Sequence, residues 1–73
     1  MKINVCYTVT KNIDLEVSDE FKEIENDDLF HKHENEWSAL VAKLERVILD
    51  KLPEGSEILG VDDTETNEIL FEN

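Results

Sequence analysis

The longest pattern of apolar and polar positions covers residues 35–52 and has the spacing of a helix. Apolar side chains recur there at intervals of three and four residues, at Trp37, Leu40, Val41, Leu44, Val47, Ile48 and Leu52. Charged residues occupy many of the positions between them, so a helix over these residues has one wet face and one apolar face. The sequence therefore predicts one long helix whose apolar stripe is buried against the rest of the chain.

Near the start of the chain, apolar and polar positions alternate, which is typical of β-strands. One parity holds the apolar residues Ile3, Val5, Tyr7, Val9, Ile13, Leu15 and Val17. The other parity holds Asn4, Cys6, Thr8, Asp14 and Glu16. This stretch predicts a β-hairpin with one buried face and one face open to solvent.

The turn of this hairpin decides which residues pair. A two-residue turn would place Val9 opposite Asp14, whereas a three-residue loop over residues 10–12 (Thr10, Lys11 and Asn12) pairs apolar residues throughout. With that loop, the expected pairs are Val9 with Ile13, Tyr7 with Leu15 and Val5 with Val17. We expect Asn12 to adopt the left-handed conformation that such loops require, because asparagine tolerates it better than most residues.

A short helix is predicted after the hairpin, through about Glu25. Ser18 or Asp19 can cap its first turn, and its small inward face consists of Phe21 and Ile24. We expect residues 26–28 to break this helix, because asparagine and aspartate side chains compete for backbone hydrogen bonds. Residues 29–33 fit either a loop or an early turn of the long helix.

Proline and glycine at residues 53 and 55 predict the end of the long helix and a chain reversal. A second hairpin follows, with its turn at residues 63–67. We expect the inner face of this hairpin, buried against the long helix, to carry Leu59, Val61, Ile69 and Phe71. The other face is expected to carry Ile58, Gly60 and Leu70.

These elements together predict an α+β fold in the order β-β-α-α-β-β. The simplest way to bury both the helical stripe and the apolar strand positions is to pack two β-hairpins, joined in one antiparallel sheet, on the long helix, with the short helix as an extra element. We expect residues 1–73 to form a single domain, since the sequence has no repeat and no linker. The order of the strands in the sheet stays open.

The charge of the chain changes the functional picture. Of its 73 residues, 19 are acidic and 7 are basic, and the formal net charge is −12. Such a chain repels nucleic acid and anionic membranes, so we expect cationic partners and direct contact with neither nucleic acid nor membrane. The single cysteine and the lack of a long apolar run favour a reducing cytoplasm.

Only one cluster has residues that commonly bind metal. His31 and His33 can reach one ion from an extended backbone, with a neighbouring carboxylate or Cys6 as a third ligand. On a helix, His31 would instead share a face with Asp28. The alternative is two solvated histidines in an acidic surface, so zinc is a candidate and no cofactor is expected to be required. No serine or cysteine lies in a pattern of an activated nucleophile, and we expect no enzymatic activity.

Acidic residues form an almost continuous run from the first hairpin to the start of the long helix. The residues that we expect to contact a partner are Glu20, Glu23, Asp27, Asp28, Glu34 and Glu36. A second acidic cluster lies at Asp62, Asp63, Glu65, Glu68 and Glu72. Carboxylates fixed on a folded scaffold can imitate the phosphates of DNA and occupy a basic groove. Trp37 could also anchor a partner, although its place in the stripe favours the core.

Three stretches of the chain resemble small acidic proteins of phages and mobile elements of low-GC Gram-positive bacteria. They are the opening strands at residues 2–5 and 9–17, the helix start Asn35-Glu36-Trp37, and the close at residues 52–55 and 70–72. Such proteins include anti-CRISPR inhibitors of type II-A Cas9, some of which are DNA mimics. The resemblance implies a non-enzymatic protein of the host bacterial cytoplasm that binds Cas9, or another basic nucleic-acid-binding protein, and blocks loading of target DNA. The alternatives are a zinc-binding regulatory protein and an accessory phage protein without Cas9 contact.

Overall fold

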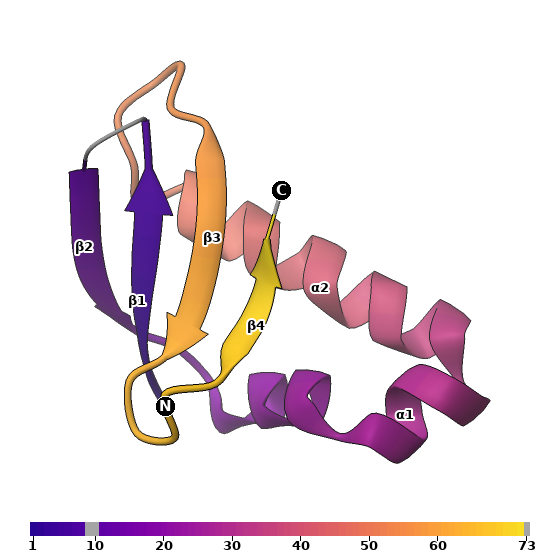
Figure 1. Cartoon of the computed structure of the whole chain (residues 1–73). Coiled ribbons are helices and arrows are strands. Elements are labelled where there is room, and N and C mark those ends of the chain that lie inside the picture. The colour runs from indigo at the N-terminus through magenta and orange to yellow at the C-terminus, as the bar shows by residue number, and fades with distance from the viewer. Residues whose placement is uncertain (9–10, 73) are drawn as a thin grey trace.

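The computed structural model describes residues 1–8 and 11–72 and confirms the α+β fold with the order β-β-α-α-β-β (Figure 1). Its elements are β1 (Lys2–Tyr7), β2 (Lys11–Glu16), the 3₁₀ helix η1 (Asp19–Glu25), α1 (Asp27–Lys32), α2 (Glu34–Leu49), β3 (Ile58–Asp63) and β4 (Ile69–Glu72). The strands form one antiparallel sheet in the order β2-β1-β3-β4. The two hairpins therefore join through β1 and β3, which lie at the centre of the sheet.

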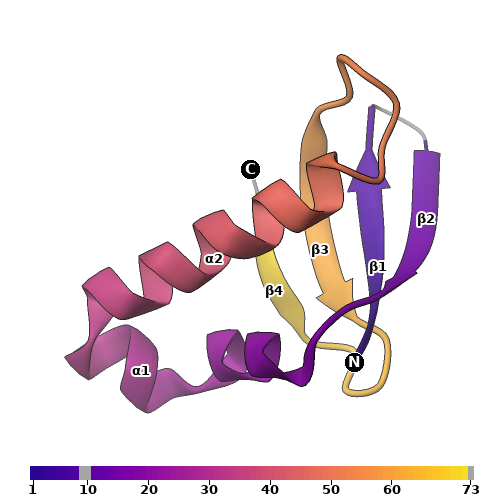
Figure 2. The same cartoon turned by 180° about the vertical axis from the view of Figure 1, so that it is seen from behind.

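All the helices lie on one side of this sheet, as the two opposite views show (Figures 1 and 2). The core lies between the inner face of the sheet and the C-terminal half of α2, where Leu44 and Ile48 are fully buried. From the sheet, Ile3, Val5 and Val61 reach the same core with no exposed surface. From η1, Phe21 and Ile24 complete it, as the sequence predicts.

The register of the first hairpin differs from the prediction by four residues along β2. Val5 lies opposite Ile13 and not opposite Val17, and Tyr7 lies opposite Lys11 and not opposite Leu15. The predicted loop residue Asn12 lies within β2, and the left-handed conformation occurs at Thr8, with φ of 45°. Val9 and Thr10, which the prediction also involved, lie outside the described residues.

Met1 explains why the observed register is preferred. The backbone N–H of Val17 donates to the carbonyl oxygen of Met1 at 2.8 Å, and both side chains belong to the core. This register places Ile3 and Val5 opposite Leu15 and Ile13 of β2, and it brings the buried Met1 next to Val17 just beyond the strand. A shift of four residues, being an even number, leaves every side chain on the same face, so the prediction of the buried face holds although the pairing was wrong.

The second hairpin turns where the sequence predicts, but two β-bulges change its faces. The backbone N–H of Asn67 donates to the carbonyl oxygen of Asp63 at 2.8 Å, and Asn67 has a φ of 61°. The pairing is irregular at Leu59 and Leu70, and an extra residue in one strand interrupts the alternation of faces. As a result, some side chains of this hairpin do not lie on the face that the sequence predicts.

The bulges move four apolar residues relative to the predicted faces. Ile58 and Leu70, expected on the outer face, are 4% and 5% exposed and belong to the core. Ile69, expected in the core, is 59% exposed, and Leu59 is only half-buried. Val61 and Phe71 pair with each other and are buried, as predicted.

The long helix is slightly shorter than predicted and begins beyond the edge of the sheet. It ends at Leu49, and the next turn is tighter, with the N–H of Leu52 donating to the carbonyl oxygen of Leu49 at 3.3 Å. Pro53 disfavours the helical conformation of the residue before it, which accounts for the early end. Leu52 still joins the core with 8% exposure.

Residues 27–32 form the separate helix α1, whereas the sequence predicted a break at residues 26–28 and either a loop or an early turn of the long helix at residues 29–33. The Asn26 side chain accepts a hydrogen bond from the backbone N–H of Asp28 at 3.0 Å, so the residue expected to break one helix caps the next. His33 separates α1 from α2 with a φ of −136°. Figure 1 shows α1 and the first turns of α2 extending away from the sheet.

Candidate functional site: an acidic surface on the helices

All six acidic residues expected to contact a partner are exposed, and all lie on η1, α1 or the first turn of α2. We call this set the helical acidic surface: Glu20, Glu23, Asp27, Asp28, Glu34 and Glu36. Figure 1 places η1, α1 and the start of α2 next to one another below and beside the sheet. The fold thus brings the three elements that carry these acids into one region.

Three of the six carboxylates are engaged within the chain. Glu20 accepts a hydrogen bond from the Lys43 ammonium at 2.6 Å, and this contact holds the pKa of Glu20 below its usual value. Glu23 accepts from the side-chain amide of Asn26 at 3.1 Å, and Asp28 lies 3.9 Å from the ammonium of Lys32. The sequence could not reveal the first contact, because Glu20 and Lys43 are 23 residues apart.

The other three carboxylates, those of Asp27, Glu34 and Glu36, form no ion pair within the described part of the chain. Each lies in the first turn of α1 or α2. The N-terminus of a helix carries partial positive charge, which favours acidic side chains there. These three acids therefore also stabilise the helices on which they lie, and their charges are available for contact with a partner.

Trp37 of α2 contacts both other helices that carry the helical acidic surface. Its indole N–H donates to the carbonyl oxygen of Ile24 at 2.9 Å, and its ring meets the edge of Phe30 at 4.9 Å between centroids. The side chain is half-buried and packs against the core cluster. Trp37 thus fixes α2 to η1 and α1, and this contact favours the core interpretation over that of a partner anchor.

The suggested metal ligands are not drawn together. Asp28 and His31 lie three residues apart on α1, where Asp28 pairs with Lys32 and the His31 ring contacts Phe30. His33 lies at the junction with α2, and Cys6 lies in β1 within the sheet. Over residues 1–8 and 11–72, no group of three or more histidine, cysteine or acidic side chains is arranged to hold a metal ion. A zinc site stays a prediction that direct metal analysis tests.

Sequence reasoning placed Asp63 in the second acidic cluster, among acids expected to be exposed, and this expectation was wrong for Asp63. Its side chain is fully buried, and its Oδ1 accepts the backbone N–H of Glu65 at 2.8 Å. Its Oδ2 has no hydrogen-bond donor among the described residues. The parity of β3 could have revealed this position, because Asp63 lies two residues after the buried Val61.

Glu25, at the end of η1, lies beside Asp63. Partial burial of the Glu25 carboxyl, followed by the hydrogen-bonding and charge interactions of Asp63, raises the pKa of Glu25. The hydroxyl of Thr66 donates to Glu25 Oε1 at 2.6 Å and acts in the opposite direction. The two acids join η1 to the turn between β3 and β4.

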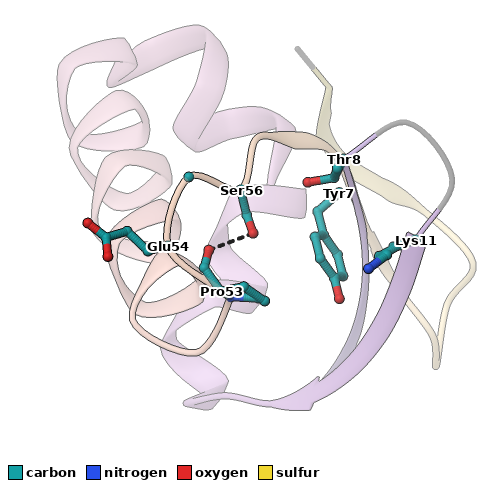
Figure 3. A pocket seen from close by; sticks show the side chains of 7 residues that line it. Tyr7, Thr8, Lys11, Pro53, Glu54 and Ser56 are labelled. Carbon is teal, nitrogen blue, oxygen red and sulfur yellow. Dashed lines mark hydrogen bonds between the residues drawn. The ribbon is translucent and has the colours of Figure 1, made fainter.

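A hollow of about 200 Å³ opens at the other end of the sheet, between β1, the start of β2 and the loop before β3 (Figure 3). Tyr7, Thr8 and Lys11 line one side, and the loop at residues 53–56 lines the other. The Ser56 hydroxyl donates to the carbonyl oxygen of Pro53 at 2.6 Å, so it holds the loop in shape. Among the described residues, the lining of this hollow includes neither histidine nor cysteine, and the groups present offer hydrogen bonds more than nucleophilic chemistry.

None of the described helices is both long and apolar enough to cross a membrane. No protein-family model, no curated protein and no solved structure matches this chain.

Proposed function

We propose that this protein binds a basic surface of a nucleic-acid-binding protein through its helical acidic surface and blocks access of nucleic acid to that surface. The observation that carries the proposal is the set of three exposed carboxylates, on Asp27, Glu34 and Glu36, that lack an ion-pair partner in the described chain. They are held at helix ends next to a region rich in other acids. Binding, without catalysis, is the function that this arrangement supports best.

The overall charge supports a target for these acids. A net charge of −12 in 73 residues exceeds the magnitude of roughly 2 to 8 that serves solubility in a small domain. Of the few basic residues, Lys22, Lys32 and Lys43 already lie close to acidic side chains. The surplus of negative charge therefore faces solvent, where it attracts and orients a basic partner.

Type II-A Cas9 is the specific partner that we propose, and this step rests on the resemblance to anti-CRISPR proteins. Carboxylates on a rigid scaffold can take the place of DNA phosphates in a basic channel. The expected consequence is that Cas9 loaded with guide RNA no longer takes up target DNA. Zinc-dependent regulation is the less favoured function, because the proposed ligands lie apart.

The first test measures DNA loading directly. Fluorescently labelled target duplex is added to Cas9 with guide RNA, with and without prior incubation with this protein, and its binding is followed by anisotropy. We expect prior incubation to prevent DNA binding at low salt and to do so less effectively as salt rises. If the protein does not bind Cas9 even at low salt, Cas9 is the wrong partner, and recovery of bound proteins from bacterial lysate then tests the wider proposal.

A pair of charge variants tests which surface is used. The first variant combines Asp27→Asn, Glu34→Gln and Glu36→Gln, and the matched control combines Asp50→Asn, Glu54→Gln and Glu57→Gln. Both remove three exposed charges, but the control residues follow α2 and lie outside the helical acidic surface. Glu20 is left unchanged, because altering it would also break the contact with Lys43.

We expect the first variant to bind the basic partner clearly more weakly than the control does. Thermal unfolding of both variants checks that neither loses its fold, since acids at helix N-termini also stabilise helices. Equal weakening in the two variants would mean that only the total charge matters. In that case the helical acidic surface is not the binding site.

A further inference from the structure

None of the helices that the structure describes covers the face of the sheet opposite α2, as the two views show (Figures 1 and 2). A hollow of about 250 Å³ lies on this open face. Its lining comes chiefly from β1, β3 and β4, from Asn4, Cys6, Leu59, Gly60, Asp62 and Glu72. The open face therefore has a concave site at its centre and is not a flat sheet surface.

Gly60 and the bulge beside it create this hollow. Gly60 has no side chain, and a Cβ built on it would meet nothing closer than Glu72 Cγ and the carbonyl oxygen of Phe71, each at 3.9 Å. The bulge at Leu59 brings that side chain to the lining of the open face, while Ile58 enters the core. The floor is thus partly apolar, with half-buried Leu59 next to the space above Gly60.

Two carboxylates stand on this lining, those of Asp62 and Glu72. Both side chains are exposed, and within residues 1–8 and 11–72 no cation lies at ion-pair distance from either. They come from adjacent strands, since Glu72 lies opposite Gly60 and Asp62 opposite Ile69. An apolar floor with two free carboxylates is complementary to a side chain that has an apolar stem and a cationic end.

We propose that this hollow binds an arginine side chain of the basic partner, a step that rests on the proposed function. Its guanidinium group would pair with Asp62 and Glu72, and its stem would lie over Leu59 and Gly60. The hollow is smaller than the roughly 300 to 1,000 Å³ of small-molecule pockets, so it suits a single side chain. The planar guanidinium group can donate to two carboxylates in fixed directions, whereas the ammonium group of lysine has no such fixed geometry. Arginine is also enriched at the centres of protein interfaces.

The test uses a short peptide, acetyl-Gly-Arg-Gly-amide, titrated into the ¹⁵N-labelled protein at low salt. The control peptide carries citrulline, which has nearly the same shape as arginine but no charge. We expect the arginine peptide to shift the amide signals of residues 60, 62 and 72 in a saturable way, and the citrulline peptide to leave them unchanged. Shifts confined to the helical acidic surface, or equal shifts with both peptides, would overturn the proposal.

Gly60→Val provides the matched change in the protein. Valine would fill the hollow without adding charge, the backbone at Gly60 needs no positive φ, and valine favours strands. We expect the variant to keep its fold and to bind the arginine peptide on the order of tenfold more weakly. A second variant, Asp62→Asn with Glu72→Gln, keeps the shape and removes the charges, and the same loss is expected. Undiminished binding by either folded variant would contradict the inference.

The same variants separate this inference from the proposed function. Suppose that the changes at Asp27, Glu34 and Glu36 weaken binding to the basic partner, whereas both variants of the hollow bind it normally. The arginine site is then wrong and the proposed function stands. If no basic partner binds the wild type, the proposed function fails, and the peptide titration alone decides whether the hollow accepts arginine. If the wild type self-associates and Gly60→Val does not, the occupant is a second copy, which contradicts the proposal.

Discussion

Asp63→Asn is expected to stabilise the protein, although it alters a fully buried residue. In the wild type, Asp63 Oδ2 is buried without a donor among the described residues, next to the carboxyl of Glu25. The substitution keeps an oxygen to accept the N–H of Glu65, and it replaces the unpaired oxygen with an amide that can donate to Glu25. The change therefore removes an unsatisfied acceptor and a repulsion between two acids.

The size of the effect follows from the cost of the unpaired group. A buried polar atom without a hydrogen bond costs about 1–3 kcal/mol. For a chain of this size, each kcal/mol corresponds to roughly 4–8 °C in the melting temperature. We therefore expect Asp63→Asn to raise the melting temperature at pH 8 by at least about 4 °C.

The gain is expected to depend on pH, because Glu25 can supply the missing donor itself. Its pKa in the folded protein is raised above the ordinary value of 4.5. Protonated Glu25 therefore stabilises the folded state fully below pH 4.5, and this contribution is lost as the pH rises through the folded-state pKa. The advantage of Asp63→Asn should be largest at pH 8 and should shrink toward pH 4.5.

Thermal unfolding gives the melting temperature and urea unfolding gives the free energy of unfolding, both followed by circular dichroism at constant ionic strength across this pH range. Asp62→Asn is the matched control, because it removes the same charge from the exposed neighbouring position. Glu25→Gln gives a second test, since its amide can donate to Asp63 at every pH. The reasoning is refuted if Asp63→Asn is no more stable than Asp62→Asn at pH 8, or if their difference does not change with pH.

Three further predictions address the fold and the metal site. Leu70→Ala is expected to lower the free energy of unfolding by about 2–5 kcal/mol, whereas Ile69→Ala lowers it by less than about 1 kcal/mol, and equal losses in urea unfolding would contradict the bulge in β4. Trp37→Phe removes the hydrogen bond to Ile24 and should lower the free energy of unfolding by about 0.5–1.5 kcal/mol in the same assay. An unchanged free energy of unfolding would contradict a role of this hydrogen bond in holding α2 to η1. Mass spectrometry of chelator-washed, untagged protein is expected to find no stoichiometric zinc. If the wild type does hold zinc and the double variant His31→Ala with His33→Ala does not, the metal site is established instead.

The sequence could predict much of this fold because two simple periodicities govern it. Alternation marked both hairpins, the helical stripe marked α2, and the capping residue Ser18 marked η1. The bulges at Leu59 and Leu70 were not predictable, because they depend on how β3 fits β1 and β4. The register of the first hairpin depended in the same way on Met1, whose burial is a tertiary effect.

The candidate site, like the fold, could be predicted from the sequence only in part. Exposure of the helical acidic surface followed from the pattern, since none of its residues lies on an apolar face. Which of these carboxylates remain free did not follow, because the Glu20 contact with Lys43 joins distant parts of the chain. The pair of Glu25 and Asp63 likewise forms only when η1 meets the turn between β3 and β4.

The salt dependence of binding to Cas9 with guide RNA tests the central claim most directly. The dissociation constant is measured over a series of salt concentrations for the wild type, for the variant altered at Asp27, Glu34 and Glu36, and for its matched control. We predict a steep weakening with salt for the wild type and the control, and a clearly shallower one for the variant, since fewer ion pairs are then lost. The same slope for all three proteins would contradict binding through the helical acidic surface.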